Sequence, residues 1–569
     1  MKKHYFFILL FLPVLLFAQI EIISTEPLDL SAYGEATTYP GEGEYEIFLS
    51  ADNVLDKPII IVDGFDPGDT RNIAGLYSSL DFTGTSGAQN LADLVRAEGF
   101  DVVILNFPTY LRDADGATID GGADFMDRNA MILVELLNVI NIAKAVNPNP
   151  EPNVIIGPSM GGIIARYALN YMEDASIDPD TRLYMSFDSP HLGANVPIGL
   201  QHQLNFLANN PLSPVAELEP LIEGFLKSSA ARQLLIDHFE PHLSGADAFT
   251  FDPLLTLPEQ HPFRTEFETR INSFTSTGFP ENVRNVAIIN GSGIGSAYLA
   301  KDGTTPVTNG FTIVNTTIPV DSPLGGAPID VEIELYMTPS AGSAQQVSRF
   351  FAPLFPPFIP DLLSVASSGT TNFDGVDSAP GGLFDLSALT GDIGAGGGIA
   401  ADFLTAMQID KFSFIPSVSA LALEITDEAT DDDVNWHHNI NIVSRGTTNN
   451  TPFDNTFLPD DNEPHVQLTQ ANVDFALLEI LTPPLSVSNE NEIAFKLEKN
   501  PIDNELVLLS NINTNANIHI IDVTGKTMYN TNLNLNNRTS IPINITSGFY
   551  ILNVTGENNT RFSTKFIVK

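Results

Sequence analysis

The sequence contains no cysteine among its 569 residues. Disulfide bonds, thiolate metal sites and cysteine nucleophiles are therefore excluded. A chain without disulfides must draw its stability from large hydrophobic cores. With 43% hydrophobic and 17% charged residues, this chain can form such cores, and its length indicates two or more domains.

Basic residues are also scarce, at 26 Lys and Arg against 70 Asp and Glu, for a formal net charge of -44. A surface this negative repels phosphate backbones, so no nucleic-acid partner is expected. The acidic run Asp427-Glu428 and Asp431-Asp432-Asp433 is compatible with calcium binding, but a solvated loop is the commoner reason for such a run. The sequence leaves a calcium requirement open, and no cofactor or metal site is predicted.

Apolar runs that could cross a bilayer are the third absence. One run, from about Tyr5 to Phe17, is shorter than the ~20 residues that a membrane-spanning helix needs. It follows two lysines and precedes Ala18, a small residue suited to cleavage. Residues 1–18 are therefore predicted to be a signal peptide of an exported protein. No membrane span is expected in the mature chain.

Short apolar runs alternate with helical patterns in the first part of the chain. The runs at 57–62, 101–107, 153–157 and 182–189 show no polar alternation, and amphipathic patterns at 124–146 and 160–174 lie between them. Strands of this kind, separated by helices, are typical of a parallel sheet that is covered on both faces. The predicted fold class is therefore α/β, with a doubly wound, mostly parallel sheet.

The pattern changes along the rest of the chain. Within a main domain at 19–483, we expect a helical cap at about 196–275 and an elaborated insertion, containing two plausible strands, at about 294–410. The sheet resumes at 283–293; the run 412–423 is interpreted as the last core strand and 470–481 as the closing helix. From 484 to 569 the chain turns to short runs separated by Gly and Asn, which predicts a small all-β domain of sandwich type.

A single serine marks the junction between the third strand and the next helix. The stretch Gly157-Pro158-Ser159-Met160-Gly161 fits G-x-S-x-G, in which small residues allow a sharp strand-to-helix turn that exposes the serine hydroxyl. The pentapeptide alone occurs by chance, but here an apolar run precedes it and a helical pattern follows. Ser159 is therefore the predicted nucleophile.

A serine hydrolase also needs backbone donors for the oxyanion. The N–H of Met160, directly after the serine, is one candidate, and the N–H of Phe65 is the other, because Gly64-Phe65 follows the end of the apolar run at 57–62. A plain strand-end turn at Gly64-Phe65 remains an alternative.

The base must be one of 10 histidines. His465 lies past the last predicted core strand and before the closing helix, where the order Ser then His of an α/β-hydrolase requires it. His191 follows its strand closely, which favours a structural hydrogen bond. His465 is therefore the predicted base.

The acid that orients the histidine is left open by the sequence. Asp377, in a tight glycine-rich loop after the cap, is the first choice, with Asp374 as its neighbour. Asp454 is close to His465 in the sequence, and Asp188 ends the fourth predicted strand. Each of these residues is also compatible with a simple turn-capping role.

The motifs from 57 to 481 resemble a known group. "GPSMGGIIARYAL" followed by "FDSPHLGANVP" is similar to α/β-hydrolase lipases and esterases in which an S-M-G-G elbow precedes a T-P-H-x-G strand end. Ser189 stands in place of the threonine. The resemblance implies a carboxylic-ester hydrolase that uses Ser159 and needs no cofactor.

The C-terminal part carries a separate resemblance. Asn500-Pro501, the run from Asp522 to Lys526, Gly548 to Val554 and Lys565 to Lys569 are similar to the sorting domain of Bacteroidota type IX secretion cargo. This resemblance implies that the outer-membrane secretion machinery is a partner, that the protein is secreted or displayed at the cell surface, and that the tail is cleaved.

Three functions are consistent with these patterns. The first is a secreted hydrolase of lipid-like or other hydrophobic acyl esters, because the cap region is apolar. The second is an amidase or peptidase on the same fold, since both reactions pass through the same kind of oxyanion. The third is a non-catalytic surface adhesin that retains the fold, although neither the nucleophile nor the base is missing.

Overall fold

The computed structural model describes residues 19–481 and 495–569, except 27, 37, 211–213, 246, 322–327, 354–360, 388–397, 424–433, 439, 441–450, 511–512, 523–525 and 557–560. The predicted signal peptide at 1–18 and the acidic run at 427–433 lie outside the described residues. The chain divides into two compact units, Met1–Thr482 and Pro483–Lys569. Of the helices described, none has both the length and the apolarity to cross a membrane.

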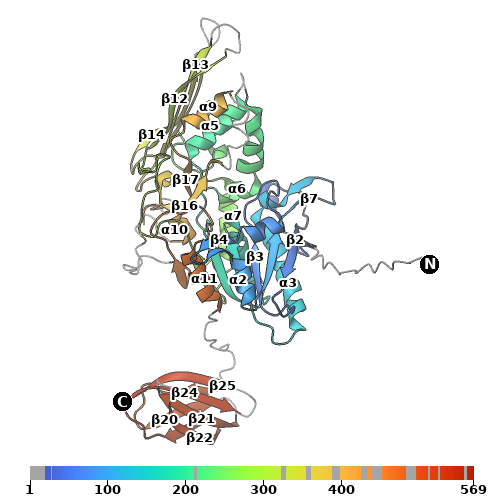
Figure 1. Ribbon diagram of the computed structural model, residues 1–569, viewed down its shortest axis with the longest axis vertical. Helices are drawn as coiled ribbons and strands as arrows, with labels where there is room; N and C mark the ends of the chain where they lie inside the picture. Colours follow the sequence, from blue (N-terminus) through green and yellow to red (C-terminus); the bar gives the residue numbers. More distant parts are fainter. Residues whose placement is uncertain are drawn as a thin grey trace, which may run out of the picture. The chain divides into compact units, whose positions relative to one another are not determined.

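An eight-stranded sheet forms the centre of the first unit, in the order β1-β2-β6-β3-β9-β10-β11-β18 (Figure 1). The two pairings of β2 are antiparallel, and every pairing from β6 to β18 is parallel. The mostly parallel sheet of an α/β-hydrolase, predicted from the sequence, is thereby confirmed. The strands are β1 (Ile20–Ile23), β2 (Glu42–Phe48), β3 (Pro58–Val62), β6 (Asp101–Asn106), β9 (Asn153–Pro158), β10 (Thr181–Phe187), β11 (Arg284–Ile288) and β18 (Asn455–Phe457).

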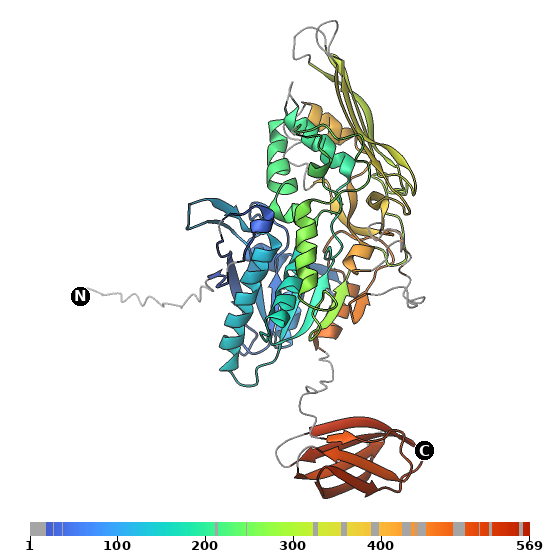
Figure 2. The same cartoon turned by 180° about the vertical axis from the view of Figure 1, so that it is seen from behind.

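Helices cover both faces of this sheet, which explains why its strands lack polar alternation. In β3, Ile60 and Val62 pack into one hydrophobic cluster, while Ile59 and Ile61 pack into another on the opposite face. The first cluster includes α3 (Met126–Ala145) and α4 (Met160–Asp174), and α3 lies in front of the sheet in Figure 2. The second includes α1 (Ile73–Ser78), α2 (Leu91–Ala97) and α11 (Gln470–Leu481).

The chain between β10 and β11 is helical. It contains α5 (Ile198–Asn209), the π-helix η4 (Leu221–Leu226), α6 (Ser229–Leu234) and α7 (Pro262–Ser273). Their apolar residues, including Phe206, Leu226 and Phe267, belong to the same cluster as α3 and α4. This segment therefore extends the core beyond the carboxyl ends of the parallel strands.

A second sheet follows β11 and is antiparallel throughout. Its four strands are β12 (Thr312–Val320), β13 (Ile329–Tyr336), β14 (Ala344–Ala352) and β15 (Leu362–Gly369). One face packs on α5, where the buried ring of His202 lies between the hydroxyls of Ser348 and Ser364. Smaller elements are the hairpins β4 (Asp81–Gly84) with β5 (Gly87–Asn90) and β7 (Thr109–Leu111) with β8 (Thr118–Asp120), together with α9 (Gly398–Ala406) and α10 (Ser417–Ala420).

The last strand of the main sheet differs from the prediction. The run at 412–423 contributes β17 (Lys411–Pro416), which among the described strands pairs with β16 (Gly381–Asp385) in a separate two-stranded ribbon. The main sheet instead ends with the three-residue β18, beside β11. Residues Asn455 and Thr456 are polar and only half-buried, so β18 shows no apolar run. β17 is apolar because it is buried, not because it joins the central sheet.

The second unit consists of two antiparallel sheets around their own hydrophobic cluster, as predicted. One contains β19 (Phe495–Leu497), β20 (Glu505–Ser510) and β23 (Arg538–Pro542). The other has the order β22 (Thr527–Leu535), β21 (Thr514–Asp522), β24 (Gly548–Gly556) and β25 (Arg561–Val568). Leu506 and Leu508 from the first sheet share the cluster with Ile518 and Leu552 from the second.

The separate cores predict that the first unit folds without the second. A chain that ends at Thr482 should keep its secondary structure and a cooperative thermal transition, because the hydrophobic clusters of the first unit, over the residues that the structure describes, contain no residue beyond Ile480. Circular dichroism of the truncated and full mature chains checks this. Loss of the cooperative transition on truncation would contradict it.

Candidate active site

The turn between β9 and α4 presents Ser159 in a strained conformation. Its backbone has φ 53° and ψ -131°, a positive φ that is rare for a residue with a side chain. Two glycines make the turn possible: a Cβ on Gly157 would collide with Gly162, and a Cβ on Gly161 would collide with the carbonyl oxygen of Val62. The small residues of the motif are therefore required by close backbone packing.

Ser159, His465 and Asp188 form a continuous chain of hydrogen bonds. The Oγ of Ser159 lies 2.8 Å from Nε2 of His465, and Nδ1 of His465 lies 2.7 Å from Oδ2 of Asp188. A carboxylate at Nδ1 favours the tautomer with its hydrogen there, so that Nε2 is free to accept the proton of the serine hydroxyl. The geometry is that of a nucleophile, a base and an orienting acid.

The Asp188 carboxylate is fixed on both of its oxygens. Its Oδ1 accepts the N–H of Asn290 at 3.0 Å, while Oδ2 accepts from His465. The side chain has 0% exposure, and the backbone of Gly382 passes so close that a Cβ there would overlap the carboxylate. The acid is therefore held in one position by its surroundings.

The loop before α11 positions His465. Its backbone N–H donates to the carbonyl oxygen of Leu383 at 2.8 Å, which attaches this loop to β16. The ring meets Phe414 of β17 edge to face, with centroids 5.2 Å apart. Its side chain keeps 12% exposure. The ribbon β16–β17, although outside the main sheet, thus supports both the acid and the base.

The two predicted oxyanion donors come from adjacent backbone segments. A Cβ on Gly64 would lie 3.2 Å from Cβ of Ser159 and 3.7 Å from N of Met160, so the Gly64-Phe65 loop runs beside the elbow. Neither the Phe65 N–H nor the Met160 N–H donates to a protein acceptor in the described parts of the chain. Both groups are therefore available to a developing negative charge.

An ion pair between the buried Asp63 and the partly exposed Arg71 holds the Gly64-Phe65 loop. Oδ1 of Asp63 accepts the N–H of Gly64 at 2.7 Å and an N–H of Arg71 at 3.1 Å. The same Nη2 of Arg71 donates to the carbonyl oxygen of Phe65 at 3.0 Å. Burial raises the pKa of Asp63 to about 7, against the opposing influence of the Arg71 guanidinium.

The acid favoured by the sequence, Asp377, does not contact His465, and the structure corrects that choice. Oδ2 of Asp377 accepts the N–H of Thr338 at 2.9 Å, and its carbonyl oxygen accepts the hydroxyl of Tyr298. Burial raises the pKa of Asp377 to about 6. The residue stabilises a turn at the end of β13 rather than the histidine.

The other candidates behave similarly, apart from Asp188. Asp374 accepts the N–H of Ala341, and Asp454 accepts the N–H of Asn285, so both bind local backbone. The expected position of the acid is after the cap, whereas Asp188 precedes the cap. A stronger signal was the adjacency of β9 and β10: their parallel pairing places Phe187 opposite Pro158, so the residues that follow both strands emerge at the same edge.

His191 has the structural role that the sequence suggested. Its Nε2 lies 2.8 Å from the hydroxyl of Ser186, and burial holds its pKa well below the usual range. Among the described residues no group of three or more His, Asp or Glu side chains is arranged to hold a metal ion.

Comparison with known proteins identifies the C-terminal unit. Residues 500–569 match the family described as the secretion system C-terminal sorting domain. This unit is a type IX secretion sorting domain. The match implies interaction with the secretion machinery and indicates a protein that is secreted or held at the cell surface. A search of curated proteins finds no match.

Solved structures similar to the chain include esterases and a lipase. The lipase BlEst2 of Bacillus licheniformis in its propeptide form is 10% identical, with TM-score 0.30, over 92% of this chain and 96% of its own. Est1E of Butyrivibrio proteoclasticus is 10% identical, with TM-score 0.21, over 43% and 74%. The esterase domain of a Rhodothermus marinus protein is 12% identical, with TM-score 0.21, over 48% and 75%. At scores this low, the fold assignment rests on the strand order and the elbow of this chain.

The contact between His465 and Asp188 predicts a spectroscopic signature. A hydrogen bond from an imidazole N–H to a buried carboxylate at 2.7 Å deshields the Nδ1 proton strongly, because such bonds are short and charge-assisted. We expect a far-downfield proton resonance that disappears in Asp188→Asn and remains in Asp377→Asn. Its loss in Asp377→Asn alone would contradict the pairing.

The buried Asp63 carboxyl predicts a pH-dependent stability. Its folded-state pKa is about 7, against about 3.9 in an unfolded chain. Its contribution to stability is therefore complete below about pH 4 and is lost as the pH rises through 7. We expect Asp63→Asn, which stays neutral, to gain stability relative to the wild type between about pH 4 and about pH 8, measured by urea unfolding. A difference that does not change with pH would disprove the shifted titration.

Proposed function

We propose that the first unit is a secreted serine hydrolase that cleaves carboxylic esters with hydrophobic acyl groups. The observation that supports this most directly is the hydrogen-bonded chain from Ser159 Oγ through His465 to Asp188, with distances of 2.8 Å and 2.7 Å. A turn with a purely structural role needs neither the strained φ of Ser159 nor an imidazole at hydrogen-bonding distance from its hydroxyl.

The reaction follows from the positions of these groups. His465 Nε2 removes the hydroxyl proton as Ser159 Oγ attacks the ester carbonyl carbon, and the carbonyl oxygen becomes an oxyanion near the N–H groups of Phe65 and Met160. When the intermediate collapses, the imidazolium donates its proton to the departing alcohol, leaving an acyl-serine. His465 then activates water, which attacks the acyl carbon and releases the carboxylic acid. Asp188 stabilises the imidazolium in both steps.

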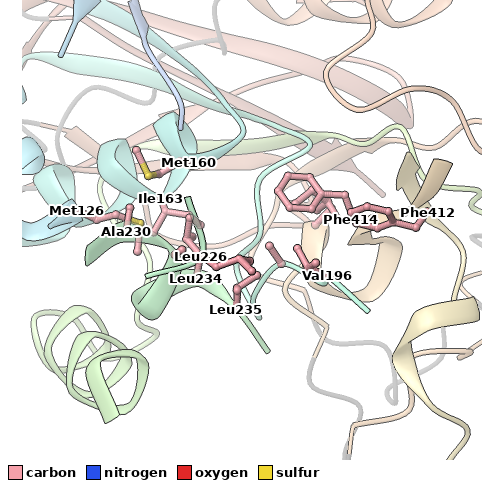
Figure 3. Packing of buried hydrophobic residues seen from close by; sticks show 14 of the residues in the cluster. Met126, Met160, Ile163, Val196, Leu226, Ala230, Leu234, Leu235, Phe412 and Phe414 are labelled. Carbon is pink, nitrogen blue, oxygen red and sulfur yellow. The ribbon is translucent and has the colours of Figure 1, made fainter. Parts of the chain in front are cut away.

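Apolar side chains around the site favour a hydrophobic acyl group. Met160 directly follows Ser159, Phe414 meets the ring of His465 edge to face, and both belong with Leu226 of the cap to one hydrophobic cluster (Figure 3). Phe225 of η4 meets Phe65 edge to face at 4.9 Å, so the cap contacts the loop that carries a proposed oxyanion donor. Apolar contact with an acyl chain would be favourable by roughly 25 cal/mol per Å² of area removed from water.

Substitution of the proposed catalytic residues tests the mechanism. We expect Ser159→Ala to abolish turnover of p-nitrophenyl esters and labelling by a fluorophosphonate. Asp188→Asn should lower kcat by on the order of 10³–10⁴ with little change in KM, because the histidine loses its orienting carboxylate. Steady-state kinetics on folded variants measures both effects.

Asp377→Asn is the matched control, since its carboxyl is buried and accepts the N–H of Thr338 but does not contact His465. It should keep kcat within a few-fold of the wild type. A mature protein that neither reacts with the fluorophosphonate nor hydrolyses esters would exclude catalysis. Faster turnover of peptide anilides than of esters would make it an amidase.

A further inference from the structure

A cavity of about 510 Å³ lies beside α4, apart from the proposed catalytic residues. Ser159, His465 and Asp188 are not among its lining residues. Its apolar wall includes Met126, Ile163 and Leu234, which Figure 3 shows close to one another. Its volume is within the range of small-molecule sites in proteins.

The polar wall contains a buried cation without a carboxylate partner. Arg166 of α4 is 5% exposed. Its Nε donates to the carbonyl oxygen of Gly278 at 2.7 Å and its Nη2 to Oδ1 of Asn272 at 2.5 Å, while the guanidinium lies over the ring of Phe279. No ion pair of Arg166 and no acceptor for its Nη1 is found in the described portion of the chain. Burial lowers its pKa to about 10, so it remains charged at neutral pH.

The other titratable side chains that line the cavity do not neutralise this charge. Arg264 and Glu268 pair with each other. His191 is kept uncharged by burial and by the nearby Arg166, which together hold its pKa well below the usual range. One positive charge therefore remains in the cavity, and buried charges are ordinarily paired because isolation in a low dielectric is costly.

The cavity is open to solvent on the side of the loop after α7. Asn272, Ser276 and Thr277 line it and are exposed, whereas Phe267, Ile271 and Phe279 are buried. A ligand that enters here would place its charged group near Arg166 and its apolar part against the wall formed by Met126, Ile163 and Leu234.

We propose that this cavity binds an organic monocarboxylate with an apolar tail. A single unpaired guanidinium matches a single negative charge, and its planar N–H groups suit a carboxylate. The apolar wall provides the contact surface for the tail. The site is separate from the proposed ester hydrolysis and does not depend on it.

Calorimetric titration of the mature protein with octanoate tests the proposal, in a Ser159→Ala background so that hydrolysis plays no part. Octanoate should bind at least about ten-fold more tightly than 1-octanol, because hydrogen bonds to a charged group contribute more than neutral ones. Octylammonium should not compete. Equal binding of octanoate and 1-octanol, or no binding of octanoate, would overturn the proposal.

Two substitutions test whether octanoate binds in this cavity. Arg166→Gln should weaken octanoate binding at least about ten-fold, and Glu268→Gln should strengthen it by freeing Arg264 from its ion pair. Arg349→Gln is the matched control, since Arg349 pairs with Glu332 on the second sheet. If Arg166→Gln fails to fold, Glu268→Gln tests the position of the ligand instead, because the Glu268 side chain is partly exposed and its substitution is tolerated more easily. Octanoate affinity that is unchanged by Glu268→Gln, or by a folded Arg166→Gln, would show that it binds elsewhere.

Discussion

The parallel pairing of β3, β9 and β10 is the constraint on which the site depends. In parallel strands the carboxyl ends emerge at one edge, and residues that follow them meet there although they are far apart in the sequence. Here Ile61 pairs with Ile156, and Phe187 pairs with Pro158. The loop with Phe65, the elbow with Ser159 and the strand end with Asp188 are thereby placed together. A shift in this register would separate all three.

Close backbone packing turns this edge into a defined geometry. The elbow is narrow because Gly157 and Gly161 leave no space for side chains, and the acid is confined because Gly382 passes directly beside Asp188. Holding Ser159 at a positive φ costs free energy, and the packing of the large hydrophobic cluster around α3 and α4 offsets that cost. A rigid core thus supports a strained turn, which is how backbone strain persists at reactive sites.

The same helix that begins at the elbow also carries the unpaired cation. Met160 at the start of α4 lies next to Ser159, whereas Arg166, two turns later, faces a separate cavity. The proposed esterase site and the proposed carboxylate site thus share one rigid helix. None of the three proposed catalytic residues lines the carboxylate site. The secretion sorting domain has its own hydrophobic core. Its role in export therefore does not depend on the catalytic residues of the first unit.

The sequence by itself determined the α/β class, the elbow at Ser159, the histidine before the closing helix and the sorting domain, because each leaves a local pattern: an apolar run, small residues at a turn, or a contiguous motif. The tertiary structure alone decided the partner of that histidine and the last strand of the sheet. Asp188 directly follows β10, whereas Asp377 lies in a short 3-10 helix between β15 and β16. Both are buried, and only their contacts show which of them bonds to His465. β18 is short and half polar, and only its pairing with β11 makes it a strand, because strand pairing depends on residues distant in the chain.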